Sequence, residues 1–463
     1  YGVVRLRNFA PRAFTPLRSL PVTKPVNGLH DLLCRQIPRR KRLGYAKAQV
    51  PHRIILFGQL RFFKALKHMF IPGRIEFLGK HTDYCGGRSI VCAIDRGFHA
   101  DTEPRNDKTL VLINRDTDET VTLDLSDPKT APHHWSKYAV EVVKRVSDNF
   151  AEFQRGVTIA FHSDLPRASG LSSSSALMIM VFAAIAEVND LHQTPSFKNN
   201  ISDAFQLAEY LGCIENGQTF NDLKGSAGVG TFGGSQDHAA ITLSRKNFLH
   251  RIAFSPLREE IRFDFPADMC FVVASSGVAA EKTGAALGLY NSLSMMVSAV
   301  TGTIAKSETL ARIIENIGIE NVRQQITEGT FEFPTQQLLD RIEQFYVENF
   351  HIIPKVSELL GEGKMNEVGE LINLSQQNAE RLLGNQIDET IFLQRSAREL
   401  GAVAASAFGA GFGGSVYAVA SVNDAGSFLR SWRETYLKHF PQHEKASEFF
   451  LTRPFQSDLP FVF

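Results

Sequence analysis

The chain has 463 residues, of which 43% are hydrophobic and 21% are charged. This length exceeds the roughly 150 residues of a typical domain, so two packed domains are expected. The formal net charge of +1 gives no general reason to expect nucleic acid or a membrane surface as a partner.

The basic and acidic residues are unevenly distributed along the chain. Residues 1–71 hold fifteen Lys or Arg and one acid, Asp31, which leaves 35 basic and 48 acidic residues for the remainder. Such a basic, acid-poor leader has three interpretations: a poorly ordered or non-native extension, a targeting segment, or a surface arm. We take residues 1–65 as a leader of the first kind. The first residue is Tyr1, so the sequence leaves the native start open.

The cysteines and the apolar runs bear on the compartment. No Cys-x-x-Cys pair and no matching His spacing occurs among Cys34, Cys85, Cys92, Cys213 and Cys270. Neither a zinc site nor a disulfide framework is indicated, and a reduced, cytoplasmic location is expected. The longest apolar run, residues 176–186, is shorter than the ~20 residues that cross a bilayer.

The first candidate site lies at residues 72–88. There, Arg74, Lys80, His81 and Asp83 stand between glycines, directly after an apolar approach. Residues around 75–77 and 89–98 are predicted strands on either side of this Gly-rich turn. Polar side chains in such a loop indicate a pocket for something small and polar.

The next predicted elements are two strands and a helix. Residues 110–114 and 119–125 are expected to form an antiparallel pair, because residues 121, 123 and 125 alternate with polar neighbours. Residues 135–153 carry apolar residues at helical spacing along one broad face.

A serine-rich loop follows a predicted strand at residues 157–161. It opens a long apolar helix over residues 176–188. A loop of small residues before a helix exposes unpaired backbone N–H groups, which suit a polyphosphate. The alternative is a serine-rich N-cap on a core helix. A P-loop is excluded, because no Gly-Lys-Ser/Thr follows the glycine.

A second helix is predicted over residues 202–216 and contains Glu215. A Gly-rich passage over residues 225–234 then leads to Asp237 and His238 and to a predicted strand at residues 239–243. Alone, each of these polar residues is a weak indication, because an Asp after glycines is usually a turn residue.

Beyond residue 245 the predicted elements are a strand at 269–275, a helix at 283–303 with Tyr290 near its start, and two amphipathic helices within 357–383. A Gly-rich segment at residues 407–415 then runs into a strand at 416–422. These glycines indicate that the backbone approaches a ligand closely or forms a tight turn.

Three Gly-rich segments in this order resemble the three motifs of the GHMP small-molecule kinases. The segments are residues 72–84, 165–176 and 409–416. The His81-Thr82-Asp83-Tyr84 run is similar to the signature of the galactokinase branch. The resemblance covers about residues 70–425. It implies an α+β fold of two domains with the active site between them, at residues 66–245 (ribosomal-protein-S5-domain-2-like) and 246–463 (ferredoxin-like).

The resemblance also implies a role for each matching residue. Arg74 and Asp237 match the catalytic pair beside the anomeric hydroxyl of the sugar. The predicted sugar contacts are Lys80, His81, Asp83, Gly234 and Tyr290. The predicted ATP contacts are Ser169, Gly170, Leu171, Ser172, Ser173, Ser174, Ser175 and Ala176. Ser174 and Glu215 match the ligands of Mg²⁺.

Two departures from galactokinases concern the substrate. Galactokinases commonly have Glu where this chain has Lys80, and residues 219–230 form an apparent insertion, expected at the lip of the pocket. A lysine donates hydrogen bonds and pairs with a carboxylate, so galacturonate or glucuronate becomes a candidate beside galactose. The alternative is that Lys80 turns outward or pairs with Asp83 or Glu76.

The implied function is ATP-dependent phosphorylation of a monosaccharide at its C1 hydroxyl, with Mg²⁺. The partners are the sugar and ATP, with no nucleic acid and no membrane, and the protein is expected to be a monomer or weak homodimer. The alternative is an inactive sensor of sugar and ATP on the same fold. The complete catalytic pair and serine loop favour the enzyme.

Overall fold

The computed structural model describes residues 67–128, 133–280 and 284–459. The predicted leader and Cys34 lie outside these residues. Phe63–Phe463 forms one compact unit. None of the described helices is both long and apolar enough to span a membrane, and the four described cysteines are buried free thiols.

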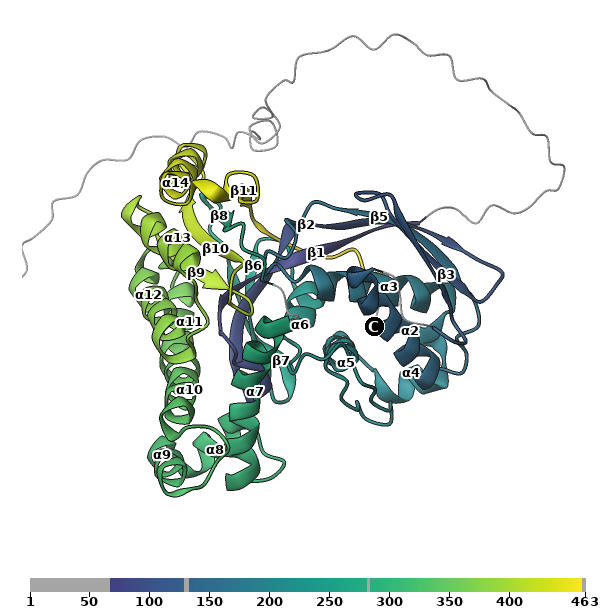
Figure 1. Cartoon of the computed structure of the whole chain (residues 1–463), viewed down its shortest axis with the longest axis horizontal. Coiled ribbons are helices and arrows are strands. Elements are labelled where there is room, and N and C mark those ends of the chain that lie inside the picture. The colour runs from purple at the N-terminus through teal and green to yellow at the C-terminus, as the bar shows by residue number, and fades with distance from the viewer. Residues whose placement is uncertain (1–66, 129–132, 281–283, 460–463) are drawn as a thin grey trace, which may run out of the picture. The chain divides into compact units, whose positions relative to one another are not determined.

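The described elements form runs of strands and runs of helices, and helices α7 to α13 follow one another between β8 and β9 (Figure 1). The strands are β1 Lys67–Leu78, β2 Arg88–Pro104, β3 Thr109–Asn114, β4 Glu119–Asp124, β5 Val157–Ser163, β6 Phe248–Phe254, β7 Leu257–Asp264, β8 Met269–Ser275, β9 Ala404–Phe408, β10 Ser415–Ser421, β11 Glu448–Thr452 and β12 Pro454–Phe455. The helices are α2 Lys137–Asn149, α3 Ser173–Val188, α4 Pro195–Asn200, α5 Ala204–Asn216, α6 Gln236–Leu243, α7 Gly284–Ile304, α8 Leu310–Ile317, α9 Ile319–Glu328, α10 Thr335–Val347, α11 Ile353–Gly361, α12 Gly369–Asn378, α13 Asp388–Glu399 and α14 Ala425–His439.

The larger sheet has eight strands in the order β4-β3-β5-β2-β6-β7, with β1 and β12 also paired to β2. The pair β3–β5 is parallel and the other pairs are antiparallel. Helices α3 and α6 both pack against β1 and β2, and Figure 1 shows them on the same side of these strands. The first turns of both helices therefore meet above strand β1.

The smaller sheet has four antiparallel strands in the order β11-β8-β10-β9. Its strands are apolar on both faces. Val272 and Ala418 belong to the hydrophobic cluster that includes Trp432 of α14, whereas Val273 and Tyr417 belong to the main core. Because side chains alternate along a strand, the continuous apolar runs at β8 and β10 place one set against the helices and the other against the larger sheet.

Aromatic rings join the two sheets. Tyr417 stacks on Phe77 with ring centroids 5.4 Å apart and meets Phe271 edge-on at 5.6 Å. The Tyr417 hydroxyl donates to the Phe77 carbonyl at 2.6 Å. Strand β1 is thus fixed from the side of the smaller sheet, immediately before the turn at Gly79. The two sheets form the two-domain α+β fold that the sequence predicts, and the boundary near residue 245 stays a prediction.

Most predicted elements occur within a few residues of their expected bounds, and β3 and β4 form the expected antiparallel pair. One prediction is wrong: residues 239–243, expected as a strand, belong to helix α6. This run is short and continuously apolar, because α6 is buried almost all round. Periodicity does not separate a buried strand from a buried helix in so short a run.

We expect Gly79→Ala to destabilise the fold severely. Gly79 has φ of 106°, and a Cβ atom there would lie 2.3 Å from Ser89 Oγ and 2.6 Å from Ser89 Cα. Left-handed strain and steric overlap together should lower the free energy of unfolding by roughly 3 kcal/mol or more, measured by urea unfolding.

Gly288→Ala in α7 is the matched control, because no atom lies within 4 Å of its added Cβ. This helical substitution should be neutral or stabilising by about 0.5–1 kcal/mol. Equal stability of the Gly79→Ala protein and the wild type would contradict the turn geometry described above.

Candidate active site

Two adjoining cavities share Arg74 and Asp237. The smaller is lined by residues of the turn after β1, the start of α6 and Tyr290 of α7. The larger, of about 640 Å³, is lined by the serine-rich loop and by aromatic side chains. Ala410, in the third Gly-rich segment, borders both. All three segments singled out in the sequence therefore converge on one site.

An ion pair stands where the cavities meet. Arg74 Nε donates to Asp237 Oδ1 at 2.9 Å, and Arg74 Nη2 lies 2.8 Å from the same oxygen. The side chains are 4% and 18% exposed. Arg74 Nη1 also donates to the carbonyl of Gly170 at 2.6 Å. Asp237 lies in the first turn of α6, where the helix dipole favours a carboxylate.

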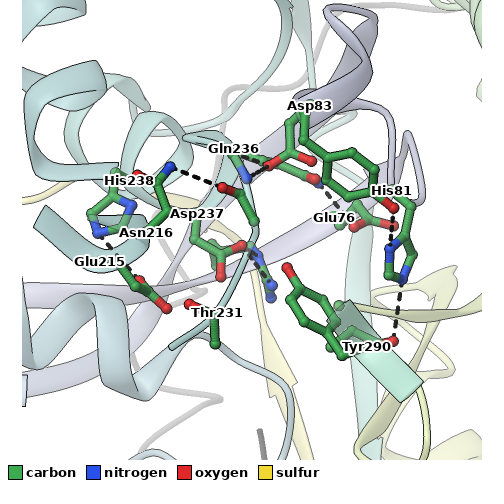
Figure 2. A pocket seen from close by; sticks show the side chains of 16 residues that line it. Glu76, His81, Asp83, Glu215, Asn216, Thr231, Gln236, Asp237, His238 and Tyr290 are labelled. Atoms are coloured by element: carbon green, nitrogen blue, oxygen red, sulfur yellow. Dashed lines mark hydrogen bonds and ion pairs between the residues drawn. The ribbon is translucent and has the colours of Figure 1, made fainter. Parts of the chain in front are cut away.

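The predicted sugar contacts other than Lys80 line the smaller cavity. Asp83 Oδ2 accepts hydrogen bonds from the backbone N–H groups of Gly234 at 3.1 Å and Gln236 at 3.3 Å. His81 is 2.9 Å from the Tyr84 hydroxyl through Nδ1, and its ring lies 5.6 Å from that of Tyr290. Figure 2 shows His81, Asp83 and Tyr290 on one side of Asp237, with Glu215 and His238 on the other.

Lys80 does not line the smaller cavity with these residues, which corrects the prediction that it contacts the sugar. Its side chain lines neither cavity and is 1% exposed. The ammonium group donates to Ser406 Oγ at 2.7 Å and to Ser375 Oγ at 3.3 Å. The reason is that Ser375 of α12 and Ser406 of β9 offer hydroxyl acceptors to the buried ammonium group. The outward orientation considered as an alternative is also wrong.

The serine-rich loop lies on the larger cavity through Gly170, Ser172, Ser173 and Ser174. Helix α3 begins at Ser173, after Ser172 in a left-handed conformation with φ of 59°. The side chains of the other four predicted contacts are turned elsewhere. Leu171 and Ala176 are in the core, Ser169 Oγ donates to the Pro166 carbonyl at 2.8 Å, and Ser175 Oγ donates to Glu215 at 2.8 Å.

The third Gly-rich segment lies directly behind this loop. Ser415 Oγ donates to the Ser169 carbonyl at 2.7 Å. A Cβ atom on Gly409 would lie 2.9 Å from the Gly170 carbonyl oxygen, so the two backbones are in close contact. Gly409 has φ of 82°, which disfavours any other residue. The segment therefore supports the loop, as the resemblance implies.

The two predicted metal ligands lie on neighbouring parts of the site. Ser174 lines the larger cavity and Glu215 the smaller one. Glu215 also lies 3.5 Å from His238 through Oε2. No group of three or more His, Cys, Asp or Glu that could hold a metal occurs among the described residues. One carboxylate and one hydroxyl nevertheless fit Mg²⁺, which commonly binds through few protein oxygens together with substrate phosphates and water.

Sequence reasoning missed Glu76 and the aromatic wall of the larger cavity. Glu76 follows Arg74 by two residues on β1, and strand periodicity would have placed both side chains on one face. Trp135, Tyr138 and Phe161 line the larger cavity, with Trp135 edge-on to Phe161 at 5.6 Å. Trp135 and Tyr138 lie in the predicted helix at residues 135–153, but Phe161 comes from strand β5, so no local pattern groups all three.

The segment 219–230, expected at the lip of the pocket, supplies no residue to either cavity. Instead, Phe220 and Leu223 are buried in the main core, and Arg145 of α2 donates to the Leu223 carbonyl at 3.3 Å. Thr231, immediately after the segment, lines the smaller cavity. One end of the segment packs on α2, whereas at the other end the Gly230 carbonyl accepts from Asn291 Nδ2 and the Val229 N–H donates to the Glu215 carbonyl, each at 2.9 Å. The place of the segment at the lip stays a prediction.

Three family models match the chain. The GHMP kinases N terminal domain matches residues 137–244, and the GHMP kinases C terminal model matches residues 356–438. The galactokinase galactose-binding signature matches residues 63–100, which include Arg74, His81 and Asp83. The chain belongs to the GHMP kinases.

Curated relatives and solved structures agree with this assignment. A galactokinase of Actinobacillus pleuropneumoniae serotype 5b is 37% identical over 136 residues, which are 29% of this chain and 35% of that relative. The chain thus spans about a third of the length of that relative. A galactokinase of Fusobacterium nucleatum is 22% identical over 80% of this chain and 90% of its own length.

Two solved structures share the fold of this GHMP kinase. Lactococcus lactis galactokinase complexed with galactose has a TM-score of 0.70 and 20% identity, covering 86% of this chain and 96% of its own. Methanococcus jannaschii mevalonate kinase has a TM-score of 0.51 and 15% identity, covering 85% and 99%.

We expect Lys80→Met to destabilise this GHMP kinase while leaving its pocket lining intact. The ammonium group is buried near the carboxylate of Glu76, and its loss removes the largest favourable charge interaction of that buried group. Breaking a buried charge arrangement should lower the free energy of unfolding by about 3–5 kcal/mol in urea unfolding.

Lys355→Met is the matched control, because this lysine is 53% exposed on α11 and should change stability by less than about 0.5 kcal/mol. If the Lys80→Met protein were as stable as the wild type but bound sugar more weakly, Lys80 would contact the sugar and the buried position described above would be contradicted.

We expect the stability difference between Glu76→Gln and the wild type to depend on pH. Burial raises the pKa of Glu76 from 4.5 to about 7, although Lys80, Arg74 and a hydrogen bond from Gln236 lower it. Glu348 adds to the rise. The folded state thus binds the proton more tightly, and wild-type stability is lost as pH rises from about 4.5 to about 7.

The Glu76→Gln variant has no carboxyl group at this position, so its stability does not fall over this pH range for that reason. Its stability relative to the wild type should therefore increase by roughly 3 kcal/mol across that range and stay constant above it. Urea unfolding at a series of pH values measures the difference. A difference that does not change with pH would show that Glu76 keeps an ordinary pKa in the folded protein.

Proposed function

We propose that this GHMP kinase transfers the γ-phosphoryl group of ATP to the anomeric hydroxyl of galactose or a closely related hexose. The observation that carries the proposal is the Arg74–Asp237 ion pair at the junction of the two cavities. A sugar in the smaller cavity and a nucleotide in the larger one would meet at this pair.

The pair can perform the chemistry that such a transfer needs. Asp237 accepts the proton of the attacking hydroxyl or orients that hydroxyl toward the phosphorus. Arg74 pairs with the carboxylate and offsets the charge that spreads over the transferring phosphoryl oxygens. Its hydrogen bond to the Gly170 carbonyl fixes the guanidinium beside the phosphate loop.

The larger cavity has the groups that a nucleotide requires. The start of α3, with Ser173 and Ser174 in its first turn, offers backbone N–H groups and a favourable dipole to the phosphates. Trp135 and Tyr138 provide an apolar wall for the base. Ser174 and Glu215 would hold Mg²⁺, which neutralises charge on the phosphates when it is bound.

The smaller cavity favours a neutral sugar over a uronate. The case for galacturonate or glucuronate depended on a cation at Lys80, and that cation is bonded to Ser375 and Ser406 instead. The carboxylates of Glu76 and Asp83 line the cavity and would repel a further carboxylate. No observation favours the inactive sensor, and the cytoplasmic location and the oligomeric state stay predictions.

We expect Asp237→Asn to lower kcat for galactose by about 100- to 10,000-fold, because the amide cannot take the proton. The sugar KM should change little, since the variant keeps the shape of the cavity. Coupled ADP release with galactose as acceptor measures both constants.

The same substitution at Asp264, an exposed residue at the end of β7 that lines neither cavity, is the control and should leave both constants unchanged. A kcat for Asp237→Asn within about fivefold of the wild type would contradict the role of Asp237, since a catalytic base contributes far more.

A further inference from the structure

We propose that Glu76 is a specificity residue that accepts a hydrogen bond from a non-anomeric hydroxyl of the sugar and so selects a hydroxyl at that position. The proposal rests on the proposed function, because it names what the same cavity requires of its substrate. Glu76 would contact the sugar without taking part in phosphoryl transfer.

The first support is the position of the side chain. Glu76 lies on β1, two residues after Arg74, so both point to the same face of the strand. Both line the smaller cavity, and Glu76 is 3% exposed. Their Cα atoms are separated by roughly 6.6 Å along the strand. Glu76 can thus reach a part of the sugar ring away from the hydroxyl that reacts beside Arg74.

The second support is an incomplete set of hydrogen bonds. Glu76 Oε2 accepts from Gln236 Nε2 at 2.9 Å, which orients the carboxylate (Figure 2). Glu76 Oε1 is buried and has no hydrogen-bond partner among the described residues. A buried acceptor without a donor is unfavourable, so a ligand that brings a donor is stabilised there.

The neighbouring charged groups do not supply the missing donor. Arg74 donates to Asp237 and Gly170, and Lys80 donates to Ser375 and Ser406. Glu348, the nearby anion, accepts from the Gly79 backbone at 2.8 Å and cannot donate while ionised. None of these charged groups donates to Glu76 Oε1, and a sugar hydroxyl in the cavity that Glu76 lines is the donor that we propose.

This arrangement predicts a sharp preference. A sugar with a hydroxyl opposite Oε1 satisfies the acceptor, whereas a deoxy analogue leaves it unpaired. Sites that hydrogen-bond a substrate hydroxyl reject analogues lacking it far more strongly than apolar pockets reject a missing methylene. A carboxylate at the same place would also face repulsion between like charges.

The test compares galactose with its monodeoxy analogues, each lacking one non-anomeric hydroxyl, in the wild type and in Glu76→Leu. In the wild type, kcat/KM should fall by at least about 100-fold for one analogue. In Glu76→Leu, the same analogue and galactose should differ by less than about fivefold, because no acceptor is left unpaired.

Glu76→Gln keeps an amide oxygen and should retain part of the discrimination. It also serves if Glu76→Leu does not fold, because a neutral amide oxygen is a weaker acceptor than a carboxylate and should discriminate less against the same analogue. Glu209→Gln, at a half-buried carboxylate on α5 that lines neither cavity, should discriminate as the wild type does.

Unchanged discrimination against the rejected analogue, in Glu76→Leu or in Glu76→Gln, overturns the proposal. The thermal shift caused by each sugar in the absence of nucleotide provides a second readout. If no sugar is phosphorylated but the wild type still distinguishes the same analogue in binding and the Glu76 variants do not, the proposed function fails while the role of Glu76 stands.

Discussion

The ion pair between Arg74 and Asp237 is the contact on which the organisation of the site depends. It joins strand β1 to helix α6 across 163 residues of sequence, and both charges are largely buried. Removing one member of a buried pair leaves an uncompensated charge, so each residue requires the other. Through its bond to the Gly170 carbonyl, Arg74 extends the constraint to the serine-rich loop. The third Gly-rich segment then holds that loop from behind through Ser415.

A second set of charges lies behind the smaller cavity and defines its chemical character. Lys80 is buried and bonded to Ser375 and Ser406, while Glu76 faces the cavity. The lysine that the sequence places beside the sugar is thus bonded in the protein interior, and the buried carboxyl group of Glu76 lines the cavity instead. The cavity thus has the carboxyl groups of Glu76 and Asp83 in its lining and lacks the ammonium group of Lys80.

The sequence was sufficient for the parts of the site that local patterns encode. The Gly-rich segments predicted the turn after β1, the loop before α3 and the backbone contact at Gly409, because each needs small residues in sequence. The sequence could not predict the side-chain direction of Lys80, because its hydrogen-bond partners lie 295 and 326 residues further along the chain. Glu76 was missed for a different reason. Strand alternation places its side chain on the same face as that of Arg74, but no motif includes Glu76. The strand predicted at residues 239–243 failed because a short buried helix has no polar face to reveal its period.

The central claim is that the Arg74–Asp237 pair directs phosphoryl transfer to the anomeric hydroxyl, and the position of the phosphate in the product tests it most directly. Incubation of the full chain with galactose, ATP and Mg²⁺, followed by phosphorus-coupled NMR of the product, identifies the phosphorylated carbon. The account predicts coupling of the phosphorus to the anomeric proton, and no such product with Asp237→Asn. Phosphate on any other carbon, or an anomeric phosphate formed equally well by that variant, would contradict it.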